Sequence, residues 1–567
     1  MRTTSLLLLL QVIPHLALAD TTLTASGGIV AADSLTASRT GAAMLARGGD
    51  AVDAAVATAL VLGVVQPFAS GIGGGGFAII HRVKGEPYAL DFREVAPGLA
   101  TRDMYLDPQG EVIPGASQAG PKAAAVPGEA AGLYTLHKRH GKLPWRDVVA
   151  PAIKLANEGF PCNQILHEKI SYLREELLQR PALRKMFLTK DGAPIPVGGT
   201  IKRPLLAQTL RSLAAKGAQA LYGGEVGKAL TDAMKRDGGL IRLKDLESYK
   251  ARRRPLVDER VMGARVLSMP PPSSGGAVLV QILRVLEGLP LRKLGWNSAA
   301  YVHRITEAMK HAFADRANVM GDPGFVHVPI KELLSPETRH RVRAAFNPKK
   351  TLPNKAYGGR YKSPSDGGTS HLSVVDKAGN AVALTTTINT GFGSLYVAGT
   401  TGIIMNNEMD DFVAAPGVPN AFGLVGREAN AIAPGKVPLS SMSPTIVLKR
   451  GRVLLVVGGS GGPTIITGTL QAILNVLLFE KDARAAVRGA RFHHQWQPDT
   501  LYMEGGFKDE AMSGLKARGH DVQQRGRFNA VQMIRVVGSR LEGASDPSKY
   551  GRAAGVKESG EIISEDP

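Results

Sequence analysis

The feature that most constrains this chain is a change in pattern at residue 369. Helical patterns dominate residues 125–250 and 298–346, and several of them end at a glycine, as helix C-caps do. After residue 369 come short apolar runs typical of strands, among them "TSHLSVVD", "AVALTTTIN" and "GTTGIIMNN" (399–407), and then a long apolar helix from residue 464. Helices on both sides of a strand-rich region predict an α+β fold in which helices cover sheets.

The segment ahead of Thr369 predicts a point of cleavage. Residues 347–368 are polar and rich in Pro, Gly and Lys, which is typical of an exposed linker. A break after Gly368 would make Thr369 a new N-terminus, and its free α-amine, with a pKa of about 7.7–8.0, could remove the proton of the threonine hydroxyl. The alternative is a plain turn, in which the glycines supply unusual backbone dihedrals and the chain stays intact.

The turn "KAGN" predicts that the strand beginning at Thr369 forms a hairpin with the next one. If Asp376 pairs with Ala381, Thr369 lies opposite Ile388, with Thr387 and Asn389 on either side. A slip of one residue would change the face on which each side chain lies. In either register a hydroxyl and an amide lie beside Thr369.

The string "VLLVVGGSGGPTIITG" has two interpretations. Gly461 and Gly462 could offer backbone N–H groups near a helix N-terminus, where a developing negative charge is favoured. The same string matches G-x-S-x-G, so Ser460 could instead be a nucleophile, with Asp499 and His520 following in triad order. Against that second interpretation, the preceding strands do not alternate with helices as an α/β-hydrolase requires.

Other polar residues have the chemistry of a substrate clamp. Arg93 suits a carboxylate, which a guanidinium can bind through two parallel hydrogen bonds. Ser440 and Ser441 could donate to the same group, although local capping is their commoner role. Glu408 and Asp411 could bind an ammonium group, although an acidic loop is more often simply solvated.

The N-terminus predicts export. Arg2, the apolar run "LLLLLQVI" and "ALA" at 17–19 form a signal peptide over residues 1–19, so we expect a periplasmic or secreted protein that begins at Asp20. No later run is long enough to predict a membrane span.

Charge and metal-ligand patterns exclude other classes of protein. The net charge is +20, but the basic residues are dispersed and only 5% of residues are aromatic, so we expect no nucleic-acid partner. The single cysteine, Cys162, cannot form an intramolecular disulfide and is expected to be a small residue that is buried or half-buried. His493 and His494 are adjacent rather than four residues apart, so no metal is expected.

Seven motifs carry a resemblance to a known family. They are "DFREVAP", "MPPPSSGG", "TSHLSVVD", "NNEMDDF", "PLSSMSPTIV", "GGSGGPTIIT" and "RFHHQWQPD". With these motifs in this order, the chain resembles the γ-glutamyltransferase (γ-glutamyltranspeptidase) family of N-terminal nucleophile hydrolases from about residue 25 to 550. The resemblance implies a four-layer αββα sandwich, made as a precursor that cuts itself between Gly368 and Thr369. The large subunit, 20–368, and the small subunit, 369–567, would then share one composite domain.

The resemblance also implies a role for each site residue. By position, the nucleophile is Thr369, the supporting hydroxyl is Thr387, the oxyanion hole is Gly461 and Gly462, the α-carboxylate clamp is Arg93, Ser440 and Ser441, and the α-amino clamp is Asn389, Glu408 and Asp411. Residues 416–430 resemble a lid loop, in which Phe422 stands where a tyrosine is common. Gly368 and Ser370 also depart from the usual pattern, where a polar residue and a second threonine are frequent.

The function implied is hydrolysis and transpeptidation of γ-glutamyl compounds such as glutathione, through a γ-glutamyl ester on Thr369. Acceptors would be water, amino acids or dipeptides, the active form would be a heterodimer of the two fragments, and no cofactor would be needed. One alternative is a cephalosporin (glutaryl) acylase of the same fold, against which the intact clamp and the lid argue. The others are a Ser460 α/β-hydrolase and a basic secreted binding protein without catalytic activity.

Overall fold

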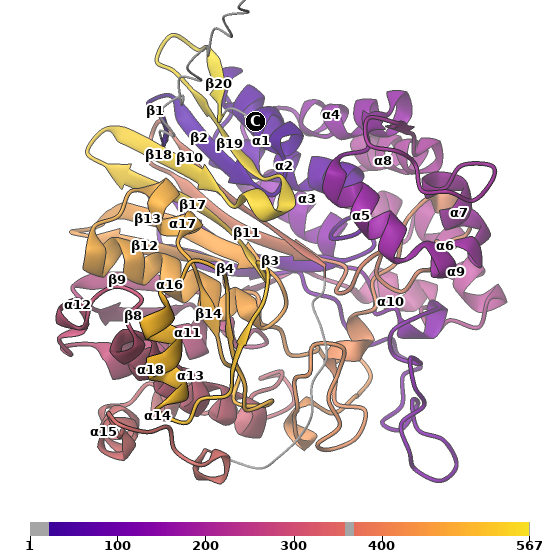
Figure 1. Ribbon diagram of the computed structural model, residues 1–567. Helices are drawn as coiled ribbons and strands as arrows, with labels where there is room; N and C mark the ends of the chain where they lie inside the picture. The colour runs from indigo at the N-terminus through magenta and orange to yellow at the C-terminus, as the bar shows by residue number, and fades with distance from the viewer. Residues whose placement is uncertain (1–21, 358–367, 566–567) are drawn as a thin grey trace, which may run out of the picture.

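The structure is a computed structural model that describes residues 22–357 and 368–565. The predicted signal peptide and residues 358–367 of the predicted linker lie outside the described residues. Two large β-sheets stack face to face, and helices cover the outer face of each (Figure 1). The predicted α+β sandwich of helix, sheet, sheet and helix layers is confirmed.

The first sheet has eight strands in the order β20-β19-β2-β10-β11-β3-β4-β7. Its strands are β2 (Gly28–Ala32), β3 (Gly75–His81), β4 (Tyr88–Asp91), β7 (Arg252–Arg254), β10 (Thr369–Asp376), β11 (Ala381–Thr387), β19 (Arg552–Val556) and β20 (Ile562–Ser564). Strand β2, from before Gly368, lies between β19 and β10, from after it, so neither part of the chain completes the sheet alone.

The second sheet has seven strands in the order β1-β18-β17-β13-β12-β9-β8. Its strands are β1 (Leu23–Ala25), β8 (Val257–Val261), β9 (Ala264–Ser268), β12 (Thr445–Lys449), β13 (Arg452–Ser460), β17 (Ala530–Val537) and β18 (Arg540–Ser545). Apolar side chains of both sheets, including Phe77, Ile79, Ile446 and Val456, fill the space between them. The three strands at 252–268 were not predicted from the sequence, which was interpreted as helical up to residue 250.

Helices pack on the two outer faces (Figure 1). On and beyond the first sheet lie α1 (Leu35–Ala46), α2 (Ala51–Val65), α3 (Glu129–His140), α4 (Trp145–Glu158), α5 (Gln164–Tyr172), α6 (Arg174–Leu178), α7 (Pro181–Phe187), α8 (Pro204–Lys216), α9 (Glu225–Arg236) and α10 (Leu243–Ser248). On the side of the second sheet lie α11 (Gly275–Leu286), α12 (Leu291–Leu294), α13 (Ala299–Val319), α14 (Ile330–Leu333), α15 (Pro336–Ala345), α16 (Thr464–Phe479), α17 (Ala483–Arg488) and α18 (Asp509–Lys516). The remaining short strands are β5 (Phe160–Pro161), β6 (Thr200–Ile201), β14 (Phe492–His493), β15 (Leu501–Met503) and β16 (Val522–Gln524).

Helix α2 shows how local sequence determines position. Asp50 accepts hydrogen bonds from the N–H groups of Val52 (2.9 Å) and Asp53 (3.3 Å), and the Asp53 carboxylate accepts one from the Asp50 N–H (2.9 Å). This capping box fixes the start of the helix. All fifteen of its residues are buried, because a helix that is apolar on every face must be covered on every face.

The register of the β10–β11 hairpin differs by one residue from the prediction. Thr369 lies opposite Thr387 rather than Ile388. Within the turn, the Asp376 carboxylate accepts hydrogen bonds from the N–H groups of Ala378 (2.9 Å) and Asn380 (3.0 Å). With this side-chain cap Asp376, the last residue of β10, lies opposite Asn380, so that Val375 and not Asp376 pairs with Ala381.

Two other expectations were wrong in part. Residues 399–407 form no strand; they contain a 3₁₀ turn at Gly399–Thr401, and Gly399 and Gly402 adopt positive φ values of 55° and 68°, which a strand does not allow. The predicted linker is not exposed throughout, because Tyr357 is buried and its hydroxyl donates to the Glu307 carboxylate. Cys162 is buried, as expected.

Within the described ranges, every helix is too short or too polar to cross a membrane.

Candidate active site

The sequence motifs converge on one pocket at the start of β10. It is lined by the expected residues Arg93, Thr369, Thr387, Asn389, Glu408, Asp411, Phe422, Ser440, Ser441 and Gly462, together with Leu424, Met442, Pro463 and Ile465. Among the residues with a predicted catalytic, clamp or lid role, Gly461 does not belong to this lining, and neither does Gly368 at the predicted point of cleavage. Residues from strands, loops and a helix start, far apart in the chain, thus share one small space.

Thr369 lies against the carbonyl group that precedes it. Its Oγ1 donates to the Gly368 oxygen at 2.8 Å and lies 3.1 Å from Thr387 Oγ1. The Thr387 hydroxyl donates to the same Gly368 oxygen at 2.9 Å, and it accepts a hydrogen bond from the Asn389 N–H at 2.8 Å. Two threonine hydroxyls and a carbonyl group that accepts a hydrogen bond from each of them therefore meet at the predicted point of cleavage.

Arg93 is buried between two carboxylates. Nη1 lies 2.5 Å from Glu408 Oε1, Nη2 lies 2.5 Å from Asp411 Oδ2, and Nε donates to the Pro438 carbonyl at 2.9 Å. Burial raises the pKa values of Glu408 and Asp411. Arg93 opposes that rise only in part, because one guanidinium is shared between two buried carboxylates. A zwitterionic ligand would therefore replace these ion pairs: its carboxylate would pair with Arg93, and its ammonium group would pair with Glu408 and Asp411.

A second buried cation, which sequence reasoning missed, lies beside the clamp. Arg316 on α13 donates to the hydroxyls of Ser274 (2.9 Å) and Ser441 (3.4 Å). Burial lowers its pKa to about 10, so it stays charged at neutral pH. It holds the Ser441 side chain in place and adds a positive charge on the side of the predicted α-carboxylate clamp. No motif marks it, because it is one arginine within an ordinary helix.

The glycine string does not have the geometry of a catalytic triad. The Ser460 hydroxyl donates to the Asp33 carboxylate at 3.1 Å. His520 instead contacts His303 at 2.7 Å, and Asp499 contacts Lys310 at 3.0 Å. The triad interpretation is therefore wrong.

Gly461 and Gly462 follow β13 and precede α16 with φ values of 129° and 56°. In this conformation glycine is strongly favoured, and the backbone turns sharply before the start of the helix. The Phe422 ring packs closely here: a Cβ atom on Gly462 would lie 2.7 Å from it. Gly462 N–H is thus near the pocket, at the end of α16 that favours negative charge.

The predicted lid loop is bound at its centre to the acidic segment of the site. Asn420 Nδ2 donates to Asp411 at 3.2 Å, and the Ala421 N–H donates to Asp410 at 2.8 Å. Gln495 donates to the Phe422 carbonyl at 3.2 Å, and the Phe422 side chain is buried. The loop therefore forms part of the pocket wall, through Phe422 and Leu424.

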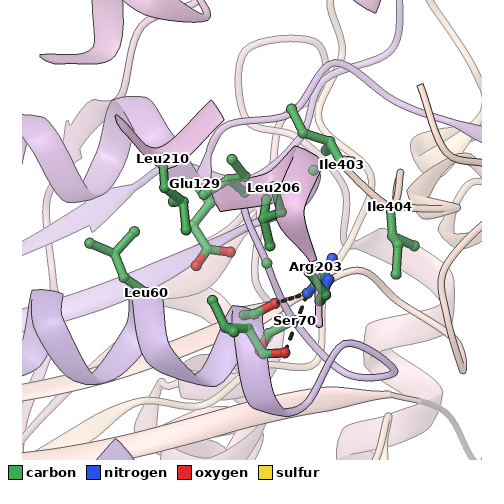
Figure 2. A pocket seen from close by; sticks show the side chains of 13 residues that line it. Leu60, Ser70, Glu129, Arg203, Leu206, Leu210, Ile403 and Ile404 are labelled. Carbon is green, nitrogen blue, oxygen red and sulfur yellow. Dashed lines mark hydrogen bonds between the residues drawn. The ribbon is translucent and has the colours of Figure 1, made fainter. Parts of the chain in front are cut away.

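A second hollow lies behind the strands of the site, and sequence reasoning did not predict it. Figure 2 shows Glu129 and Arg203 within it, among Leu60, Leu206 and Leu210. Burial raises the pKa of Glu129 to about 8, and its Oε2 accepts a hydrogen bond from Thr386 on β11 at 2.5 Å. Arg203 donates to the Gly63 carbonyl at 2.7 Å in the last turn of α2, where a helix favours a cation.

One group of potential metal ligands occurs in the described part of the chain, namely His303, Glu307 and His520. Their polar atoms already bind one another or the neighbouring chain: His303 Nδ1 and His520 Nε2 are 2.7 Å apart, and Glu307 accepts from Thr351 at 2.6 Å. The group is satisfied as a hydrogen-bonded core. His493 is similarly bound, to Thr467 (2.9 Å) and Gln495 (2.9 Å).

The fold consists of two stacked sheets between helix layers. The first residue of an inner strand is a threonine whose hydroxyl faces a polar pocket. These two features together define the N-terminal nucleophile hydrolase class. The gamma-glutamyltranspeptidase family model matches residues 37–556, so the chain belongs to that family and is an enzyme.

Individual relatives agree with this assignment. The glutathione hydrolase proenzyme of Escherichia coli is 42% identical over 525 residues, covering 92% of this chain and 90% of its own. The structure of a cephalosporin acylase from Bacillus halodurans superposes with a TM-score of 0.84 at 26% identity and covers 97% of this chain and all of its own. The γ-glutamyltranspeptidase of Helicobacter pylori matches with a TM-score of 0.55 at 40% identity, over 56% of this chain and 91% of that one.

Proposed function

We propose that this chain is the precursor of a γ-glutamyltransferase and glutathione hydrolase. The observation that carries the proposal is the Thr369 hydroxyl, which lies 2.8 Å from the Gly368 carbonyl oxygen in a pocket that also holds Arg93 and two carboxylates. The 42% identity with a glutathione hydrolase proenzyme favours this function over the acylase alternative, whose structural relative is 26% identical.

The first reaction is cleavage of the chain itself. Thr369 Oγ1 attacks the Gly368 carbonyl carbon, the C–N bond breaks, and the Gly368 acyl group passes to the oxygen as an ester while the nitrogen becomes an amine. Water then hydrolyses the ester and leaves fragments 20–368 and 369–567. Thr387 supports this step, because its hydroxyl already donates to the carbonyl oxygen on which negative charge develops.

The second reaction uses the new N-terminus. The Thr369 amine accepts the hydroxyl proton, and Oγ1 attacks the γ-carbonyl carbon of the substrate. The N–H groups of Gly461 and Gly462 stabilise the oxyanion, and the protonated amine gives its proton to the departing amine. Water or the amino group of an acceptor then takes the γ-glutamyl group from Thr369.

Charge complementarity favours a γ-glutamyl over a glutaryl donor. A glutamyl group carries an α-carboxylate for Arg93, Ser440 and Ser441, and an α-ammonium group for Asn389, Glu408 and Asp411. A glutaryl group lacks the ammonium, so it would take Arg93 from the two buried carboxylates and leave them without a replacement cation.

The natural setting is the periplasm or the exterior of the cell, as the predicted signal peptide over residues 1–19 indicates. There the two fragments would remain together as a heterodimer, because each large sheet contains strands from both.

A donor comparison tests the proposed function. Release of p-nitroaniline is measured from γ-glutamyl-p-nitroanilide and from glutaryl-p-nitroanilide, with and without glycylglycine as acceptor. We expect preference for the γ-glutamyl donor and faster release with the acceptor. Preference for the glutaryl donor would favour the acylase, and no release from either donor would contradict both functions.

A further inference from the structure

We propose that Lys549, held by Asp33, is a positioning residue that acts on the nucleophile's backbone and sets the pH range in which the freed Thr369 amine can serve as base. This inference rests on the proposed function, because only a cleaved chain has that amine. None of the sequence motifs contains either residue.

The contact between Lys549 and the nucleophile is direct. Lys549 Nζ donates to the backbone carbonyl oxygen of Thr369 at 2.5 Å and lies 3.7 Å from Asp33 Oδ2. The lysine side chain is 13% exposed, and the Asp33 side chain is fully buried. A mostly buried ammonium group is thus fixed between a carboxylate and the residue that carries the reacting hydroxyl.

Both partners are held firmly by their surroundings. Asp33 follows β2 and accepts hydrogen bonds from the Ser460 hydroxyl (3.1 Å), the His371 N–H (3.4 Å) and the Gln532 amide. Lys549 ends the 3₁₀ turn η7 (Pro547–Lys549), which is capped by the carboxylate of Asp546.

Gln66 connects the two partners and the nucleophile strand. Its Nε2 donates to the Asp33 carbonyl at 2.5 Å and to the Lys549 carbonyl at 3.4 Å, and its Oε1 accepts from the Ser370 hydroxyl at 3.3 Å. The lysine therefore lies where the large fragment, the nucleophile strand and the C-terminal part of the chain meet.

The position of the charge has a chemical consequence. The carbonyl oxygen and the nitrogen of one residue are separated by only three bonds, so the ammonium group lies within about 6 Å of the Thr369 nitrogen. A like charge at this range disfavours the protonated amine, and Asp33 offsets part of that effect. The neutral amine is the form that can accept the Thr369 proton, so Lys549 extends catalysis to lower pH.

Other ionisable groups also surround Thr369. They are His371 on the same strand, Asp33 and Asp546 near the lysine, Glu129 behind β11, and Arg93, Glu408 and Asp411 in the pocket. Burial lowers the pKa of His371 to about 3, so it is uncharged. The pocket cation, Arg93, is already bound by two carboxylates. Among these groups Lys549 is the cation that bonds Thr369 itself.

The test compares Lys549→Met with the matched control Lys549→Arg. The pH dependence of kcat/KM for γ-glutamyl-p-nitroanilide is measured from pH 5 to 10 on the cleaved form of each protein. We expect the acid limb of Lys549→Met to move to higher pH by about one unit, while Lys549→Arg stays within a few tenths of a unit of the wild type. At high pH the methionine variant should recover most of its activity.

A second variant should shift the acid limb of the pH profile in the opposite direction. Asp33→Asn removes a negative charge that offsets part of the effect of the lysine, so its acid limb should move to lower pH. An acid limb of Lys549→Met that coincides with the wild type, or a loss of activity that is equal at every pH, would overturn the inference. If Lys549→Met is not cleaved, Asp33→Asn decides the matter by the direction of its shift. A wild-type protein without cleavage at Thr369 would instead contradict the proposed function.

Discussion

Two clusters of buried charge near Thr369 differ in what they bind. In the clamp cluster, Arg93 contacts Glu408 and Asp411, and none of the three forms a hydrogen bond with Thr369. In the backbone cluster, Lys549 contacts Asp33 and the carbonyl oxygen of Thr369. We therefore expect the first cluster to act on whatever enters the pocket, and the second to act on the proposed nucleophile.

The two clusters also differ in their balance of positive and negative charge. The clamp cluster has two carboxylates for one guanidinium, which suits a ligand that brings an ammonium group as well as a carboxylate. The backbone cluster contains the ion pair of Lys549 and Asp33, and burial raises the pKa of Asp33 to about 6 while Lys549 opposes that rise. Damage to the first cluster should weaken substrate binding and turnover at every pH, whereas damage to the second should move the pH profile.

The largest expected effect comes from substitution of Thr369, whose hydroxyl both proposed reactions require. Thr369→Ala should remain one chain and lose all γ-glutamyl transfer, because it lacks the attacking oxygen. Thr369→Ser keeps a hydroxyl and is the matched control, which should still be cleaved. A denaturing gel and a p-nitroaniline assay measure both properties, and normal cleavage of the alanine variant would be incompatible with the account.

The next largest effect should come from the clamp cluster. Arg93→Lys keeps the charge that Glu408 and Asp411 require but loses the planar fork, and loss of such a buried charged hydrogen bond costs about 2–5 kcal/mol. We expect kcat/KM for γ-glutamyl donors to fall by roughly 30- to 4,000-fold. The midpoint of the acid limb should stay where it is in the wild type, in contrast to Lys549→Met. A shifted midpoint with little loss of kcat/KM would erase the distinction between the clusters.

Glu129 provides a third case, a buried carboxylate that forms no ion pair in the described chain. Its folded pKa is raised to about 8, above its unfolded value near 4.5, so the folded state retains a proton that the unfolded state loses. Stability should therefore fall as pH rises from about 4.5 to 8. Glu129→Gln should remove this loss and raise Tm by a few degrees at pH 9, with little change at pH 4.5. Equal Tm differences at the two pH values would contradict this assignment.

The smallest expected effect concerns the lid. Phe422→Tyr adds a hydroxyl to a ring that already packs on Gly462, and one new hydrogen bond contributes about 0.5–1.5 kcal/mol. Substrate binding should tighten by roughly 2- to 12-fold, and the share of turnover that ends in hydrolysis should fall. Glutamate release is compared with dipeptide formation in the presence of glycylglycine. An unchanged ratio with an unchanged KM would mean that the ring only packs the loop against the pocket.

Sequence reasoning succeeded where residue type and motif were sufficient. The family resemblance implied that Arg93, Asp411 and Ser441 share one site, and the structure places all three in one pocket. The predicted register of the hairpin is wrong by one residue, because the Asp376 side chain caps the turn. Alternation of apolar residues in the sequence does not reveal that contact.

Contacts between distant parts of the chain were beyond prediction from the sequence. Asp33 follows a short apolar strand and Lys549 stands in a polar turn, and only the fold brings them to Thr369. The same holds for Glu129 and Arg203, which look like ordinary surface residues in helical sequence but are buried. Their function depends on neighbours that local patterns do not specify.

The most direct test of the account is the identity of the new N-terminus. The purified protein is separated on a denaturing gel, and the smaller band is analysed by N-terminal sequencing and intact-mass measurement. The account predicts two polypeptides, of which the smaller begins Thr-Ser-His-Leu and extends to the C-terminus. A single active chain, or a smaller fragment that begins at any residue other than Thr369, would contradict it.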